Sequence, residues 1–378
     1  MAIFRKKEQK EKKKKSFLSI ILIILIVLVA LSIILVTAGI IYIRSLLDYN
    51  YNEITSENLG ANETIDDKTI NIALFGVDSR DENSFEGRSD SIMILSFSTT
   101  TKKIKLISVM RDSFVPIEKE SGVVYSKINL AYSTGGPELA IKTLNNVFAL
   151  DITEYATVNL GGMEDIVDAV GGVQVTVTED ELATLNSDLK REAQKYGGDK
   201  EDYRIQAGKQ NLNGIKAVLY SRIRYVANSE GTRDDYGRTD RQRIILEQLI
   251  KKATTMDKTR YIELIGTLGP CCESSLTKTE ILDMATKVLL NNPTFSEGRV
   301  PSLDYIMNSP KTNAGSVVYY DLEYAANIIH SFIYDDIKPN EYIEQNEIQK
   351  NDWYSTGYKP PVIKNKEKTS GDSSTVSK

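Results

Sequence analysis

The chain has 378 residues, of which 41% are hydrophobic and 26% charged, enough apolar material for a sizeable folded core. Its 47 basic residues face 52 acidic ones, so no nucleic-acid partner is expected for a chain with a formal charge of −5. Only Cys271, Cys272 and one histidine, His330, are present, which excludes a disulfide framework, a cysteine-based zinc site and nearly all histidine-dependent triads.

A basic tail and an apolar segment open the chain. Residues 1–16 carry eight Lys and Arg against two Glu, and residues 17–43 contain no charge. As a helix, the second segment would span about 40 Å, more than the ~30 Å of bilayer hydrocarbon. The positive-inside bias then predicts a single-pass cell-membrane protein with a cytoplasmic N-terminus, an extracellular domain and a tail touching anionic membrane lipid. The alternative is a cleaved signal peptide, whose apolar core would be only about 7–15 residues long.

The remaining chain divides into three parts by composition. Residues 44–68 are polar and acidic and predict an extracellular stalk. Residues 69–340 predict one folded domain. Residues 341–378 form a C-terminal extension, and its end lacks apolar content and is predicted to be disordered.

Three short apolar runs begin the domain and predict a meander of strands: Ile70–Val77, Ser91–Phe97 and Ile104–Met110. If consecutive strands pair antiparallel, the first strand's end, the second's start and the third's end share one edge of the sheet. Strand polarity alone therefore brings three charged residues together: Asp78, Asp90 and Arg111.

The next segments alternate in type. Pro137–Ala149 has apolar residues at helical spacing and predicts a helix over the core. A strand (Tyr155–Leu160), a helix (Met163–Val170) and a strand (Val173–Val177) follow and predict a βαβ unit with parallel pairing. The fold class is therefore α/β: a single domain with a mixed central sheet flanked by helices, preceded by one transmembrane helix.

The second half is expected to be mainly helical. Residues 178–202 predict a surface excursion or helical insert, and the loop Val226–Gly237 is expected to be mobile. Periodicity then predicts four helices and one strand in this order: helix Thr239–Thr254, helix Thr259–Leu268, helix Thr279–Leu290, strand Val317–Tyr320 and helix Leu322–Ile333.

Two groups of residues could carry chemistry. Asp78 and Asp90 flank one loop and offer oxygen ligands of the kind Mg²⁺ prefers, although both could simply be turn-forming aspartates. Arg222 and Arg224 alternate by two, so on an extended segment both guanidinium groups point the same way, while Arg238 and Gln242 share one face of a helix start. Like charges gathered in this way repel one another unless an anion lies between them. The alternative for these arginines is a solvated basic face paired with neighbouring aspartates.

Eight motifs occur in one order between Asn71 and about Ile250, and together they resemble the LytR-CpsA-Psr family of Gram-positive cell-envelope phosphotransferases. The motifs are Gly76–Arg80, Gly87–Ser91, Ile107–Asp112, Lys127–Asn129, Gly171–Val173, Leu212–Gly214, Arg222–Arg224 and Asp235–Gln242. Met110 departs from the pattern, because proline often precedes the arginine there.

The resemblance implies a role for each matched residue. Asp78 and Asp90 would hold Mg²⁺. The pyrophosphate of a polyprenyl-pyrophosphate-linked glycopolymer would be bound by Arg88, Arg111, Lys127, Arg222, Arg224, Arg238 and Gln242. Four of these arginines (Arg111, Arg222, Arg224 and Arg238) would be catalytic, with Asp235 as a candidate proton acceptor. The glycopolymer, such as teichoic acid or capsule, would move onto a peptidoglycan acceptor.

A lipid donor would need an apolar slot, for which the helices Pro137–Ala149 and Thr239–Thr254 are candidate walls. Three other functions remain open. The same site could hydrolyse lipid-linked pyrophosphates, or the protein could bind anionic polymers without catalysis. Transcriptional control is remote, because about sixteen residues before the anchor are too few for a DNA-binding domain.

Overall fold

The computed structural model describes residues 39, 41–42, 44–45, 49–55, 59–61, 65–79, 84–196, 204–257, 260, 264, 266–267, 269–291, 293–302 and 311–346. The basic tail and nearly all of the apolar segment at 17–43 lie outside these residues. So do most of the helix expected at Thr259–Leu268 and the end of the C-terminal extension. Within the described part of the chain, no helix is both long and apolar enough to cross a membrane.

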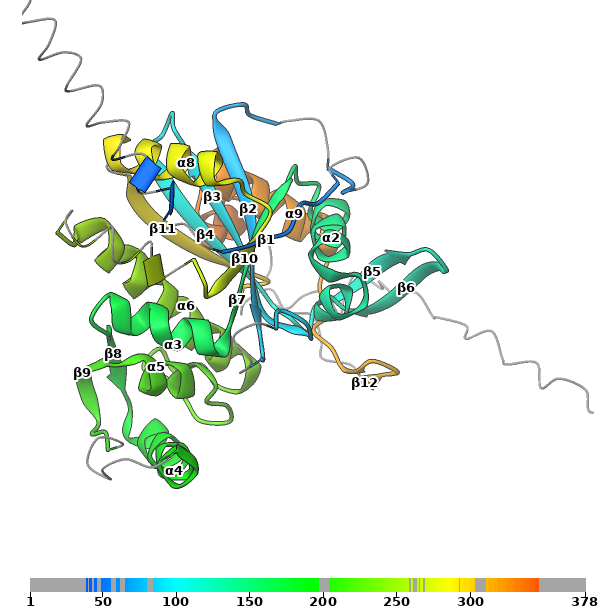
Figure 1. Cartoon of the computed structure of the whole chain (residues 1–378). Helices are drawn as coiled ribbons and strands as arrows, with labels where there is room; N and C mark the ends of the chain where they lie inside the picture. The colour runs from blue at the N-terminus through cyan, green and yellow to red at the C-terminus, as the bar shows by residue number, and fades with distance from the viewer. Residues whose placement is uncertain are drawn as a thin grey trace, which may run out of the picture.

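A seven-stranded mixed sheet forms the centre of the molecule (Figure 1). The predicted meander is confirmed, because β2 pairs antiparallel with β3 and β3 with β4. On either side of it, β7 pairs parallel with β2 and β11 pairs parallel with β4. In spatial order the strands are β1 (Asn50–Tyr51), β10 (Cys272–Ser274), β7 (Glu154–Asn159), β2 (Thr69–Val77), β3 (Ser89–Ser98), β4 (Lys103–Val109) and β11 (Thr294–Val300).

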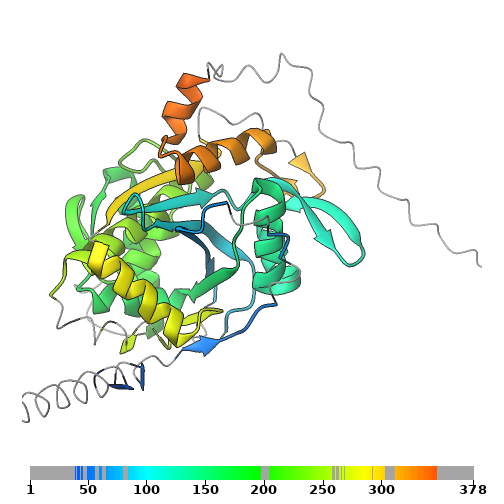
Figure 2. The same ribbon diagram turned by 90° about the horizontal axis from the view of Figure 1, so that it is seen from above.

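Helices cover both faces of this sheet, as Figure 2 shows. One face packs on α2 (Asn129–Phe148) and α9 (Leu322–Tyr334), and α10 (Pro339–Gln345) packs beside α9. On the other side lie α3 (Leu160–Ala169), α6 (Asp234–Thr255) and α8 (Lys278–Asn291). The α/β class with a mixed, helix-flanked sheet is therefore confirmed.

Two hydrophobic cores hold these layers together. The first core lies between the sheet and α2 with α9, and includes Ile94 and Phe148. The second core lies among α3, α6 and the elements beyond them, and includes Val167 and Ile245. Strand residues alternate between faces, so Ala73 and Phe75 of β2 join the first core while Leu74 points to the opposite face.

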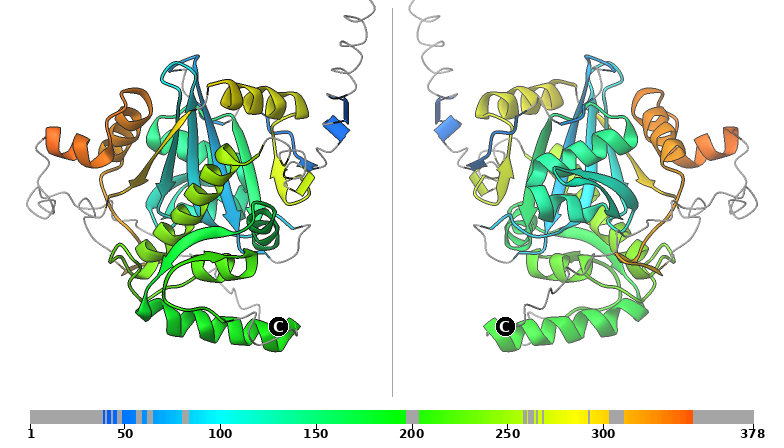
Figure 3. Two further views of the ribbon diagram at one scale, coloured as in Figure 1. Left: turned by 90° about the vertical axis from the view of Figure 1, so that its left-hand side faces the viewer. Right: turned by 90° about the vertical axis from the view of Figure 1, so that its right-hand side faces the viewer.

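The remaining elements lie outside the central sheet (Figures 1 and 3). They are the β5 (Phe114–Lys119)–β6 (Gly122–Lys127) hairpin, the β8 (Val173–Val177)–β9 (Gly208–Leu212) ribbon, the short β12 (Lys311–Thr312)–β13 (Gly315–Ser316) pair, and the helices α4 (Glu179–Tyr196) and α5 (Gly214–Ser221). The region at 178–202 is thus a helical insert over its described part.

The predicted βαβ unit is wrong. Strand β8 does not pair with β7 but runs antiparallel to β9 in a separate two-stranded ribbon. Gly171 and Gly172 adopt positive φ angles of 78° and 83°, which turns the chain away from the sheet after α3. The parallel pairing in the sheet comes instead from β7 lying beside β2.

Three further expectations need correction. Helix α2 begins at Asn129 and is kinked at Gly135 and Gly136, whereas the prediction began it at Pro137. The segment Val317–Tyr320 is not a strand but contains isolated bridge residues, one of which joins Val318 to Ser113. The strand β11 was not expected, because its sequence is polar and contains a glycine.

The predicted stalk packs against the domain where it is described. Strand β1 pairs with β10, and Leu59 is 1% exposed within the first core. The side-chain amide of Asn145 donates a hydrogen bond of 2.9 Å to the Leu59 carbonyl. We therefore place the start of the folded unit before Thr69.

Candidate functional site

Strand polarity brings the first site residues to one edge of the sheet. Strand β2 ends just before Asp78, β3 contains Asp90 near its start, and β4 ends two residues before Arg111. Nη1 of Arg111 lies 2.5 Å from Oδ1 of Asp90. Asp78 and Asp90 line the same cavity, so the predicted convergence holds in the structure.

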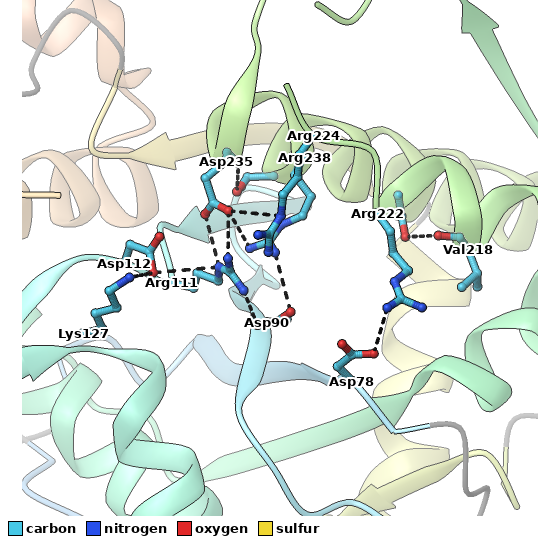
Figure 4. A network of polar contacts seen from close by, with 12 residues as sticks. Asp78, Asp90, Arg111, Asp112, Lys127, Val218, Arg222, Arg224, Asp235 and Arg238 are labelled. Atoms are coloured by element: carbon cyan, nitrogen blue, oxygen red, sulfur yellow. Dashed lines mark hydrogen bonds and ion pairs between the residues drawn. The ribbon is translucent and has the colours of Figure 1, made fainter. Parts of the chain in front are cut away.

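Asp235 joins this edge to helix α6 (Figure 4). Arg111 donates to both of its carboxylate oxygens, from Nε to Oδ2 at 3.3 Å and from Nη2 to Oδ1 at 3.1 Å. Nη2 of Arg238 lies 3.0 Å from Oδ1, and Nε of Arg224 lies 4.0 Å from the same oxygen. One carboxylate therefore holds three guanidinium groups side by side.

The start of α6 places its polar residues on one face. Asp235, Arg238 and Gln242 follow one another at spacings of three and four, so their side chains share one side of the helix. This arrangement is possible because α6 begins at Asp234, five residues earlier than periodicity predicted. Arg238 and Gln242 both line the cavity.

Burial changes the protonation energetics of two arginines. The side chain of Arg238 is 3% exposed, and this burial lowers its pKa to about 10 despite the nearby Asp235 and Asp90 carboxylates. Burial also opposes the charge on Arg111, but Asp235, Asp90 and Asp112 outweigh it and raise its pKa. Both side chains are therefore cationic at neutral pH.

Asp112 extends the network outward and was not singled out from the sequence, although it follows Arg111 within one of the quoted motifs. Its Oδ1 atom lies 2.9 Å from Nζ of Lys127 and 3.9 Å from Nε of Arg111. Lys127 ends the β5–β6 hairpin, which brings it back to the sheet edge. Four cations (Arg111, Lys127, Arg224, Arg238) thus face three carboxylates (Asp90, Asp112, Asp235), leaving an excess of positive charge.

Arg222 and Asp78 form a separate pair. Nη2 of Arg222 lies 3.5 Å from Oδ1 of Asp78, and Figure 4 shows this pair apart from the Asp235 cluster. The expectation that Arg222 and Arg224 share an extended segment is wrong, because Arg222 caps the end of α5 in a helical conformation. Their side chains nevertheless line one cavity from different directions.

Arg88 stands outside these networks. Its side chain is exposed, and it makes no ion pair with any residue that the structure describes. The loop in front of it, residues 80–83, is not among the described residues. The predicted pyrophosphate-binding role of Arg88 therefore remains a prediction.

A cavity of about 400 Å³ joins the charged residues to an apolar floor. At its charged end lie Asp78, Asp90, Arg222, Arg224, Arg238 and Gln242. Its apolar lining comes from the sheet (Leu74, Met93, Val158), from the start of α3 (Leu160, Met163) and from α6 (Ile245, Leu246). The helix expected at Thr239–Thr254 is therefore one wall of this cavity.

The other expected wall, at Pro137–Ala149, is wrong. That part of α2 packs into the first core on the opposite face of the sheet, where Leu144 and Phe148 are buried. Helix α3 takes its place in the lining. Apolar periodicity marks a buried helix face but does not say which face of the sheet the helix covers.

The donor set for a metal ion is small. Among the residues that the structure describes, no group of three or more His, Cys, Asp or Glu side chains is arranged to hold a metal. Asp78 and Asp90 still offer carboxylate oxygens to one cavity, and Mg²⁺ commonly takes one or two carboxylates together with substrate phosphates and water. The two carboxylates are compatible with Mg²⁺ bound together with a phosphorylated ligand.

Comparison with known proteins identifies the fold family. The model of the LytR_cpsA_psr family matches residues 45–327, most of the chain. The chain belongs to the LytR_cpsA_psr family. The resemblance inferred from the eight motifs is thereby confirmed, and the family match begins within the region expected to be a stalk.

Individual relatives agree with this assignment. The chain is 32% identical over 216 residues to the polyisoprenyl-teichoic acid–peptidoglycan teichoic acid transferase TagU of Bacillus cereus, covering 57% of this chain and 63% of TagU. It is 30% identical over 223 residues to the corresponding transferase TagV of Bacillus subtilis, covering 58% of this chain and 54% of TagV. The matches thus span less than two thirds of either relative.

A solved structure shares the fold. The LytR-CPS2A-psr family protein YwtF (TagT), determined with bound octaprenyl pyrophosphate lipid, superposes with a TM-score of 0.53 at 17% identity. The superposition covers 75% of this chain and 99% of that structure.

Proposed function

We propose that this LytR_cpsA_psr protein is a phosphotransferase that moves a glycopolymer from a polyprenyl-pyrophosphate carrier onto a peptidoglycan hydroxyl. Teichoic acid is the polymer named for its relatives TagU and TagV. One observation carries the proposal: a single cavity connects an apolar lining to a cluster of arginines. A polyprenyl pyrophosphate has the same two parts, an apolar chain and a doubly phosphorylated head.

The charge arrangement suits phosphate transfer. Asp90 and Asp235 hold Arg111 and Arg238 in place within the protein itself. Guanidinium groups fixed in this way can stabilise charge that develops on phosphate oxygens without reorganising during the reaction. Of these two arginines Arg238 lines the cavity, where Arg222, Arg224 and Gln242 provide further donors.

The reaction replaces the phosphoanhydride bond of the donor with a phosphodiester bond to the acceptor. The oxygen of the acceptor hydroxyl attacks the phosphorus attached to the glycopolymer, and the bond from that phosphorus to the bridging oxygen breaks. Polyprenyl phosphate leaves with the bonding electron pair, and the proton of the hydroxyl passes to a base. We assign Asp235 as the candidate base, since its carboxylate lies beside Arg111 and Arg238 at the phosphate-binding end of the site.

Mg²⁺ remains part of the proposal. Asp78 and Asp90 would hold it, and a bound Mg²⁺ would supply further neutralisation of the pyrophosphate charge. The arginines would contact the same phosphates directly and orient the donor.

We place the catalytic domain outside the cell, at the membrane surface, with residues 17–43 as its anchor and residues 1–16 in the cytoplasm. The support is the uncharged length of the segment and the basic tail before it. An anchored domain would meet lipid-linked donors where their polyprenyl chains reside.

The test is transfer by the full-length chain in detergent, with a polyprenyl-pyrophosphoryl teichoic acid precursor, peptidoglycan fragments and Mg²⁺. Mass spectrometry would quantify conjugate and released polyprenyl phosphate. Formation of both in equal amounts supports the transferase. Release of polyprenyl phosphate with free glycan phosphate and no conjugate would instead show a pyrophosphatase, and donor binding without turnover would show a non-catalytic polymer-binding protein.

A further inference from the structure

A buried arginine on α6 forms hydrogen bonds to the turn Ile223–Val226, which carries Arg224. The side chain of Arg241 is 0% exposed. Its Nη1 donates to the carbonyl of Ile223 at 3.0 Å, and its Nη2 donates to the carbonyl of Val226 at 2.9 Å. These two carbonyls lie on either side of Arg224 and Tyr225, so one planar guanidinium holds both ends of the turn Ile223–Val226.

The grip on this turn matters because its backbone is strained. Tyr225 adopts a positive φ of 68°, a conformation that aromatic residues rarely take. Such a conformation persists only where surrounding contacts determine it. The two hydrogen bonds from Arg241 enclose this residue and are suited to maintain it.

Glu181, in the first turn of α4, holds Arg241 from the other side. Nε of Arg241 donates to Oε1 of Glu181 at 2.6 Å, and the Glu181 side chain is also 0% exposed. The other oxygen of Glu181 accepts from the backbone amide of Thr178 at 2.7 Å, while the hydroxyl of Thr178 donates to the carbonyl of Ala227. Three backbone carbonyls, those of Ile223, Val226 and Ala227, are therefore bound by Arg241 or by Thr178, which contacts the Glu181 side chain.

The Thr232 carbonyl and the Arg241 guanidinium both lie so close to position 237 that only glycine fits there. A Cβ atom at Gly237 would lie 2.7 Å from the Thr232 carbonyl and 3.1 Å from Nη1 of Arg241. Any larger residue would push the loop and the guanidinium apart. The loop Val226–Gly237, which its composition predicts to be mobile, is thus held by hydrogen bonds at several points in the structure.

From these contacts we infer that the buried Arg241–Glu181 pair, with Thr178, is a positioning unit that holds Arg224 at the phosphate-binding end of the cavity. This gives the helical insert around α4 a role in the active site. The inference rests on the proposed function, because it concerns how the same site binds a pyrophosphate. Arg241 acts through Arg224 and does not itself line the cavity.

A double-mutant cycle tests this coupling in the full-length protein. We would compare wild type, Arg241→Lys, Arg224→Ala and the double variant for the Kd of octaprenyl pyrophosphate, well below the unfolding temperature of each. Arg241→Lys keeps the charge but loses the planar fork, and we expect it to raise Kd about 10-fold. On the Arg224→Ala background the same change should raise Kd less than about twofold.

Lys252 provides a matched control on the same helix. Its Nζ also donates to loop carbonyls, those of Gly171 at 3.0 Å and Val170 at 3.5 Å, but that loop carries no cavity residue. Lys252→Met should lower thermal stability without changing Kd. Thr178→Val provides a milder variant, and it should weaken binding in the same direction as Arg241→Lys.

The outcomes separate the two ideas. This inference would be overturned, with the proposed function left standing, by either of two results. One is that Arg241→Lys raises Kd equally in the wild-type and Arg224→Ala proteins, and the other is that neither Arg241→Lys nor Thr178→Val raises Kd. Failure of the wild-type protein to bind octaprenyl pyrophosphate would overturn the proposed function and the inference with it.

Discussion

Arg111 and Asp235 form a two-bond pair that links the end of β4 to the first turn of α6. The pair connects segments more than a hundred residues apart in the chain and sets the spacing between the sheet edge and the helix. Because Asp90 contacts the other terminal nitrogen of Arg111, the guanidinium is held on both sides. The two carboxylates therefore fix the orientation of Arg111 from within the protein itself.

We expect Arg111→Ala to abolish detectable transfer while the protein stays folded. Loss of one fixed donor to a developing oxyanion commonly costs about 10²–10³-fold in kcat. Asp90 and Asp235 would retain Arg238 as a partner, so neither carboxylate would be left without a cation. The measurement is kcat for conjugate formation, with circular dichroism and Tm to verify folding.

Arg191→Ala is the control for this change, since Arg191 is an exposed arginine of α4 that pairs only with the neighbouring Asp188 among the described residues. A folded Arg111→Ala protein with undiminished kcat would remove Arg111 from the catalytic set.

Asp78→Asn should weaken the dependence on Mg²⁺. If Asp78 is a ligand, the Mg²⁺ concentration for half-maximal transfer should rise about tenfold or more, since altering groups around a metal typically costs 10–100-fold in affinity. Asp283 is the matched control: it is similarly exposed, at 57% against 50% for Asp78, and each pairs with one cation. An unchanged Mg²⁺ titration in Asp78→Asn, or full activity in the presence of EDTA, would contradict the metal assignment.

Leu246→Asp should discriminate against donors with long lipid chains. Leu246 lines the apolar part of the cavity, where a carboxylate would oppose burial of a hydrocarbon tail. We expect kcat/KM to fall about tenfold or more for a long polyprenyl donor and much less for a short-chain analogue.

The exposed Leu290 of α8, with 80% of its surface accessible, offers a control substitution to aspartate. Equal losses for long and short donors in Leu246→Asp would show that the chain binds elsewhere.

Leu59→Ala should destabilise the domain although Leu59 precedes the first strand of the meander. A fully buried leucine truncated to alanine typically costs about 2–5 kcal/mol, because it leaves a cavity as well as losing apolar contact. Leu59 is buried against the first core, so Tm should drop by several degrees. A matched Leu290→Ala change should leave Tm nearly unaltered, and an equally small effect at Leu59 would mean that this segment is dispensable for folding.

Local pattern was sufficient to predict the meander and its consequences. Alternating apolar runs marked β2, β3 and β4, and antiparallel pairing of neighbours then placed Asp78, Asp90 and Arg111 at one edge. Spacing along α6 likewise put Arg238 and Gln242 on one face. These inferences need only strand polarity and helical period.

Long-range neighbours were beyond the reach of local pattern. Strand β11 joins the sheet beside β4, and nothing in its polar sequence predicts that it pairs with β4. The same limit explains the wrong wall assigned to α2, since apolar spacing does not choose a face of the sheet. Asp112 was missed because its role depends on Lys127 returning through the β5–β6 hairpin.

The cavity is bordered by both the sheet and the second core. Leu74 and Val158 of the sheet line it together with Ile245 and Leu246 of α6. A polyprenyl tail in this space would serve as a removable piece of hydrophobic core. Donor binding would then raise the free energy of unfolding. The protein would be most stable with its donor bound and less stable after it releases the lipid.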